Sequence, residues 1–150
     1  MLVLTLCSGC LWKGEGMVRS AAVGATLETP TGQRFRLVYG EEDRMLAHLD
    51  GHIVTMEGRR VGRNLKVGEW HIPWGLHGMN VWFGQLERKG AQLGLQDQNS
   101  GAYYLLARES EEALVPYVGS NVLIEGYVAG SHVVEVLHWQ VLEKQGASDQ

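Results

Sequence analysis

One long internal repeat restricts the folds open to this chain more than any other feature. Residues 51–70 read GHIVTMEGRRVGRNLKVGEW, and residues 119–139 read GSNVLIEGYVAGSHVVEVLHW. The identical pairs are Gly51 and Gly119, Val54 and Val122, Glu57 and Glu125, Gly58 and Gly126, Gly62 and Gly130, and Trp70 and Trp139. A separation of 68 residues, which becomes 69 after a turn insertion near 130–132, indicates a duplicated domain rather than a solenoid repeat.

Weaker matches extend the repeat toward the N-terminus, with length changes confined to expected turns. We therefore expect two copies of about 60 residues, at residues 16–72 and 81–142. The remaining parts are an N-terminal segment (1–15), a linker (73–80) and a polar tail (143–150). Because domains of this size are marginally stable alone, we expect the copies to share a hydrophobic seam.

The composition suits a globular protein without a nucleic-acid-like charge balance. The chain is 45% hydrophobic, with a net charge of −4 and a pI near 5.8. This balance lacks the cationic excess that polyanion binding usually requires. No later apolar run approaches the length needed to span a membrane.

Both cysteines lie in the first ten residues, as Cys7-Ser-Gly-Cys10. A redox pair would need a following helix, and a zinc site would need a second pair, neither of which the pattern offers. The apolar run 1–6 with small residues directly before Cys10 resembles the lipobox of bacterial lipoproteins. The resemblance implies a lipid on Cys10 and a place in the cell envelope, on its periplasmic or surface side. The alternative is a hydrophobic N-terminal strand in a cytoplasmic protein.

Alternating polar and apolar residues predict five strands and one short helix in the first copy. The expected strands are 17–22, 25–28, 34–39, 52–59 and 65–72, with a helix at 41–49. Phe35 and Leu37 alternate with Arg34 and Arg36, which is typical of a half-buried strand.

The second copy repeats this order. Its expected strands are 81–86, 93–96, 103–107, 121–128 and 133–142, with a helical turn at 110–115 ended by Pro116. So few strands bury their edges best by curling into a small barrel.

The order of three strands, a helix and two strands is similar to the oligonucleotide/oligosaccharide-binding (OB) fold, once in each copy. The GHIVTMEG and GSNVLIEG stretches also look like the G-x-x-V-x-V-x-G pattern of small bacterial OB-like domains. The expected class is therefore all-β, with two tandem OB-fold-like five-stranded barrels. Gly51 and Gly119 would release the helix into the next strand, and Gly58 and Gly126 would let a strand bend to close the barrel.

OB folds bind ligands across their second and third strands, where nucleic-acid readers combine aromatic side chains with cations. The first copy offers a group of arginines, with Arg34 and Arg36 on the third strand and Arg59, Arg60 and Arg63 later. Its nearby aromatic residues are Phe35 and Tyr39. The second copy offers Tyr103, Tyr104 and Tyr127 with Arg108. Neither copy alone combines both ingredients, so ordinary solvated strand faces are the simpler interpretation.

Residues 70–83 form the stretch richest in aromatic side chains. Trp74, His77 and Trp82 are candidates for a sugar-stacking or partner-binding site, because Trp commonly anchors such contacts. The alternative is structural: Trp70 and Trp139 close the barrels, and Trp74 and Trp82 fill the seam.

We expect no metal, no cofactor and no catalytic group. The histidines are scattered, and Gly51 separates His48 from His52 on the expected helix. Glu57 and Glu125 occupy equivalent positions in separate copies, which favours a role such as accepting a bond from a turn amide over acid–base chemistry. No known nucleophile or phosphate-loop motif appears.

These patterns favour a non-enzymatic binding or scaffold protein, exported and lipid-anchored, that contacts another protein of the envelope. One alternative is a cytoplasmic protein that binds single-stranded nucleic acid through the first copy. The other is an oligosaccharide-binding module that uses Trp74 and Trp82.

Overall fold

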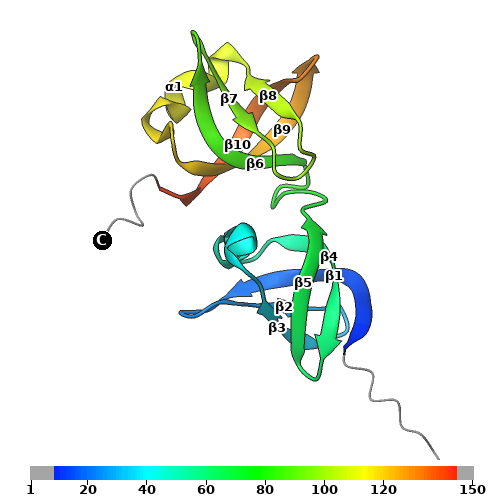
Figure 1. Ribbon diagram of the computed structural model, residues 1–150. Coiled ribbons are helices and arrows are strands. Elements are labelled where there is room, and N and C mark those ends of the chain that lie inside the picture. Colours follow the sequence, from blue (N-terminus) through cyan, green and yellow to red (C-terminus); the bar gives the residue numbers. More distant parts are fainter. Residues whose placement is uncertain (1–8, 145–150) are drawn as a thin grey trace, which may run out of the picture. The chain divides into compact units, whose positions relative to one another are not determined.

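The computed structural model describes residues 9–144. The chain divides into two compact units, unit 1 ending at His71 and unit 2 beginning at Ile72 (Figure 1). The lipobox-like residues before Gly9 and the tail beyond Lys144 lie outside the described residues. Within residues 9–144, no helix has both the length and the apolar character that a membrane crossing requires.

Unit 1 is a closed five-stranded barrel with the strand order β1-β2-β3-β5-β4. Its elements are β1 (Cys10–Ser20), β2 (Ala25–Glu28), β3 (Arg34–Val38), the 3-10 helix η1 (Glu41–His48), β4 (Ile53–Val61) and β5 (Asn64–His71). The strands pair antiparallel except for β3 and β5, which are parallel. The predicted strand-rich class and the position of the helix between the third and fourth strands are confirmed.

Unit 2 repeats each of these pairings in a ring of order β10-β8-β7-β6-β9. Its elements are β6 (Asn80–Lys89), β7 (Gln92–Gln96), β8 (Tyr103–Leu106), α1 (Arg108–Leu114), the 3-10 turn η2 (Val115–Tyr117), β9 (Asn121–Gly130) and β10 (Val133–Glu143). The single parallel pair is again between the third and fifth strands, β8 and β10.

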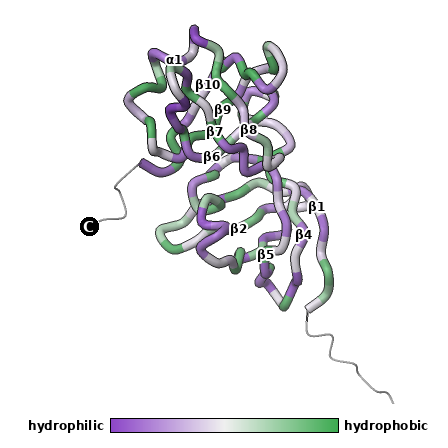
Figure 2. The backbone as a smooth tube through the Cα atoms, turned by 45° about the horizontal axis from the view of Figure 1, so that its top comes forward, coloured by the Kyte–Doolittle hydropathy of each residue, from purple (hydrophilic) through white to green (hydrophobic). Residues whose placement is uncertain are grey.

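Alternation along the strands places one apolar core inside each unit. In unit 1, Phe35 and Leu37 of β3 are buried, whereas the residue before each of them, Arg34 or Arg36, is exposed. In unit 2 the core cluster consists of Trp82, Leu86, Leu93, Leu95, Leu106, Leu114, Val122, Ile124 and Val134. Figure 2 shows hydrophobic and hydrophilic stretches interleaved along both units, as expected for strands with one buried face.

A β-bulge bends the fourth and fifth strands of each unit at the same place. In unit 1 the register shifts between Glu57 and Gly58, and in unit 2 it shifts opposite Gly126. A Cβ atom on Gly58 would collide with the carbonyl oxygen of Lys66, and one on Gly126 with that of Glu135. The predicted role of these glycines, bending a strand to close the sheet, agrees with this geometry.

The first strand is longer than the sequence predicted, because β1 begins at Cys10 and not near residue 17. The assignment of residues 10–15 to a separate N-terminal segment is therefore wrong. Gly14 lies inside the strand and pairs with Met56 of β4, and the indole ring of Trp12 covers the space where a side chain would lie. Trp12 also packs edge-on against Phe35, with ring centroids 5.1 Å apart.

The helices differ modestly from expectation. In unit 1 the helix is a 3-10 helix, although Met45, Leu46 and Leu49 are buried as predicted. In unit 2, α1 begins at Arg108, two residues early, and the chain continues through Pro116 as η2.

Gly51 and Gly119 both have positive φ angles, +82° and +91°, in the left-handed region that few other residues tolerate. This confirms their predicted role in the turn that leads into the fourth strand.

The bulge glycine of unit 2 provides a test of this closure. We expect Gly126→Ala to lower the free energy of unfolding by about 2 kcal/mol, because the added methyl group displaces a strand backbone. Gly130→Ala on the same strand is the matched control, since its Cβ would meet nothing closer than 3.9 Å. The control should change stability by less than about 0.5 kcal/mol. Equal effects of the two substitutions in chemical denaturation would contradict the steric explanation.

Candidate functional site

Unit 1 presents a set of arginines around the outer side of β3. We call this surface the arginine face and define it by Arg34, Arg36, Arg60 and Arg63. The first two project outward from β3 by strand alternation. The other two come from the end of β4 and the turn into β5, which the barrel pairing brings beside β3.

The first hollow of the arginine face has a volume of about 360 Å³. It is lined by Gly32, Gln33, Arg34, Phe35, Arg60, Gly62 and Arg63. The Arg60 guanidinium lies 5.3 Å from the centroid of the Phe35 ring, a cation–π arrangement. With its amide oxygen turned toward Arg60, Gln33 accepts from both guanidinium nitrogens, at 3.1 and 3.3 Å. Arg60 is thus held over the barrel end.

The second hollow, of about 320 Å³, lies toward the C-terminal end of β3 and adds an aromatic residue. Arg36 and Tyr39 line it together with Asn64 and the β1–β2 turn residues Val23 and Gly24. Burial raises the pKa of Tyr39, so its phenol is neutral and able to donate a hydrogen bond at neutral pH. The structure therefore combines an aromatic side chain with the arginines.

The backbone of the β4–β5 turn joins the two hollows, because the amide of Arg36 donates to the carbonyl oxygen of Arg63 at 2.8 Å. The positive charge here is partly offset, since Arg34 lies 3.4 Å from the carboxylate of Glu28. Such an exposed pair contributes little stability and exchanges readily with another anion.

The charge of the chain is unevenly divided. Unit 1 has nine Lys and Arg against eight Asp and Glu, whereas unit 2 has four against nine. The net charge of −4 therefore comes from unit 2, whereas unit 1 has a net charge of +1 and carries the expected group of arginines.

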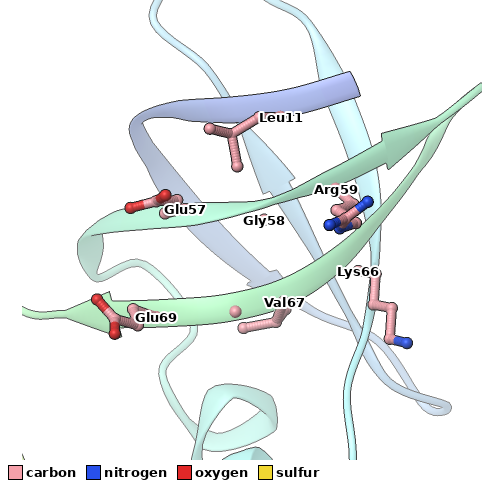
Figure 3. Close-up of a pocket in the computed structure, with 8 residues that line it drawn as sticks. Leu11, Glu57, Gly58, Arg59, Lys66, Val67 and Glu69 are labelled. Atoms are coloured by element: carbon pink, nitrogen blue, oxygen red, sulfur yellow. The ribbon is translucent and has the colours of Figure 1, made fainter. Parts of the chain in front are cut away.

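A separate groove of about 380 Å³ lies over the bulge of unit 1. We call it the bulge groove, lined by Leu11, Glu57, Gly58, Arg59, Lys66, Val67, Gly68 and Glu69. Figure 3 shows the two glutamates together at one end and the two cations toward the other. Sequence reasoning missed this groove, because the β4–β5 register that assembles it is not visible in the alternation pattern.

The segment predicted to be a linker, residues 73–80, is anchored to unit 2. The His77 amide donates to Oε2 of the buried Glu125 at 2.9 Å, and its ring nitrogen Nδ1 lies 3.2 Å from Oε1. The imidazole also stacks on that of His138, with centroids 3.6 Å apart. Asn99 holds Ile72, the residue just before this segment, by two hydrogen bonds of 2.8 Å. Its Oδ1 accepts from the Ile72 amide, and its Nδ2 donates to the Ile72 carbonyl oxygen. The predicted turn-amide role is confirmed for Glu125.

The tryptophans separate into different roles. Trp82 belongs to the unit 2 core and is 5% exposed, so its side chain is not presented to a ligand as predicted. Trp74 is 45% exposed. Trp70 donates from Nε1 to Asp43 at 2.8 Å and ties β5 to η1. Trp139 does not close its barrel, because its side chain lies at the surface beside Tyr117.

Cys10 is the first residue of β1 and is exposed, with a free thiol. Its register partner is Arg60. A lipid on this cysteine would therefore leave directly from the end of a barrel strand.

No three histidine, cysteine or acidic side chains lie close enough together to hold a metal ion within residues 9–144. The described surfaces present guanidinium groups on the arginine face and opposed charges in the bulge groove.

Comparison with known proteins gives no assignment, since no protein-family model and no curated protein sequence matches the chain.

The anchoring of residues 73–80 can be tested at Glu125. We expect Glu125→Ala to speed hydrogen exchange of the His77 amide by roughly tenfold or more, since a hydrogen bond to a charged group contributes about 1.5–3 kcal/mol. Glu57→Ala is the matched control, because it removes the equivalent carboxylate of unit 1. Unchanged protection of His77 in Glu125→Ala would show that other contacts hold the segment.

Proposed function

We propose that the protein is a non-enzymatic binding protein made of two tandem OB-fold barrels, and that unit 1 binds single-stranded nucleic acid on its arginine face. The observation that carries this proposal is the meeting of Arg36, Tyr39 and Arg63 around β3, beside the Arg60–Phe35 pair. Guanidinium groups contact phosphates, and an adjacent aromatic ring offers a stacking surface for a base.

The position of the face within the fold supports the same proposal. OB folds bind extended polymers across the second and third strands, between the loops that follow the first and fourth strands. The second hollow is bounded by the β1–β2 turn at Gly24, and the first by the β4–β5 turn at Gly62. Each hollow thus borders a loop that this binding mode uses, which supports the proposal.

The strand order supports an OB-fold assignment for both units. Each has a ring of five pairings, a parallel pair between the third and fifth strands, and a helix before the fourth strand. Arg34 and Arg36 have no equivalents in unit 2. When the two units are aligned by the pairing of their second and third strands, these positions hold Tyr103 and Leu105. We therefore assign the ligand to unit 1 only.

Fluorescence anisotropy with a labelled single-stranded oligonucleotide tests this function. We expect binding at low salt that weakens as the salt concentration rises. The slope of the logarithm of the binding constant against the logarithm of the salt concentration should fall in magnitude by about one for each phosphate contact removed. Arg36→Glu with Arg63→Glu should weaken binding at least roughly tenfold. Arg88→Glu, on the exposed part of β6 in unit 2, carries the same kind of charge change and should have little effect. Absence of binding at low salt would eliminate the function.

A second candidate is an exported, lipid-anchored envelope protein that contacts a partner protein. The exposed, free Cys10 at the start of β1 favours it. An oligosaccharide site that includes Trp82 is not supported, because that side chain is buried.

Metabolic labelling of bacteria with palmitate distinguishes the anchored form. The second candidate predicts label on the wild-type chain and on Cys7→Ala, and none on Cys10→Ala, because only the second cysteine occupies the lipidated position of the lipobox-like pattern. No label on the wild-type chain, or label kept by Cys10→Ala, would count against the anchor.

A further inference from the structure

The two units share one bulge but differ in what lies over it. In unit 1, Glu57 pairs with Glu69 and Gly58 with Val67, which leaves Gly68 as the extra residue. In unit 2, Glu125 pairs with His138 and Gly126 with Val136, which leaves Leu137 as the extra residue. Register therefore makes the bulge groove of unit 1 and the surface around Glu125 equivalent sites.

In unit 2 this surface is covered by a turn of the chain itself. Gly78 donates to the carbonyl of Gly75 at 3.0 Å, and Gly75 donates back to that of Met79 at 2.8 Å. Gly75 lies so close to Glu125 that a Cβ atom would collide with the carboxylate group. The His77 amide and ring then meet Glu125 and His138. A glycine-containing turn thus fits this surface by a backbone N–H and one side chain.

In unit 1 the chain takes a different course. The equivalent of Asn80, whose partner is Gly126, is Trp12, whose partner is Gly58. In unit 2 the chain pairs with β9 only from Asn80 onward. In unit 1, β1 pairs with β4 two residues further, through Leu11 to Cys10. Among the described residues, the surface around Glu57 is consequently an open groove with Leu11 exposed at its edge (Figure 3).

The charges in the groove define what would fill it. Glu57 and Glu69 lie directly opposite each other on antiparallel strands, an arrangement that is unfavourable without a cation between them. The His138 of unit 2 is here replaced by Glu69, so a basic side chain fits better than an imidazole stack. Arg59 and Lys66, also direct partners, lie two or three residues further along, which is about 7–10 Å.

We propose that the bulge groove is the docking site for a turn of a partner protein that carries a basic residue followed by an acidic one. The backbone N–H of the turn donates to Glu57, as that of His77 does to Glu125. Its Lys or Arg lies between Glu57 and Glu69, its apolar side chain contacts Leu11 and Val67, and its carboxylate faces Arg59 and Lys66. The site is distinct from the arginine face and independent of nucleic-acid binding.

The chain's own turn supplies the probe. A peptide covering residues 73–80, blocked at both ends and altered by His77→Lys and Asn80→Glu, is titrated into the ¹⁵N-labelled full-length protein. We expect saturable shifts of the amide signals of Glu57, Gly58, Gly68 and Glu69. The same peptide with His77→Glu should bind roughly tenfold more weakly, or not at all.

Variants of the protein complete the test. Glu57→Gln with Glu69→Gln should weaken binding of the basic peptide roughly tenfold and raise the unfolding midpoint, because it removes two opposed carboxylates. Glu15→Gln with Glu42→Gln removes the same charge from exposed sites of unit 1 and should do neither. No shifts at millimolar peptide, shifts centred on Glu125 and His138, or equal binding by both double variants would overturn the proposal.

Discussion

The close approach of two strand backbones at the bulge glycines governs much of this structure. At Gly58 and Gly126 the neighbouring strand passes so near that no side chain fits between them. A ring of five short strands needs such a bend, because straight strands would leave two open edges. The bulge also places one glutamate per unit, Glu57 or Glu125, on the outside of the sheet beside the bend. The same bulge thus both closes the sheet and places a carboxylate beside the bend.

Whether that carboxylate is covered depends on the course of the chain at the start of the first strand of each unit. Glu125 is buried and needs partners, because a buried charge without hydrogen bonds is costly. The His77 amide and ring meet this need, which explains why residues 73–80 are held as a turn and do not form a free linker. Within residues 9–144 no such turn covers Glu57, which is partly exposed, because β1 continues along β4. The duplication thus preserves the backbone and changes the covering of one surface.

The sequence predicted those features that depend on local pattern. Alternation predicted the outward arginines of β3, and the repeat predicted the glycines at the bulge and at positive φ. It failed at the start of β1, because the pairing of residues 10–15 with β4 is a long-range contact that leaves no local pattern in the sequence. The burial of Trp82 could have been predicted, because Trp82 lies on the same face of its strand as Gly84 and Leu86. The bulge groove could not have been predicted, since it depends on the register between two strands.

Net charge was the least informative of the sequence measures for the candidate site. At physiological salt, charges act over about 8 Å, so a ligand of the proposed site would respond mainly to the groups nearest the arginines. Of those neighbours, Arg34 already has Glu28 as a partner, and Arg60 is fixed by Phe35 and Gln33. A fixed guanidinium loses little side-chain entropy on binding an anion. The net charge of the whole chain therefore says little about this face, and the proposed binding depends on the few arginines whose position the barrel determines.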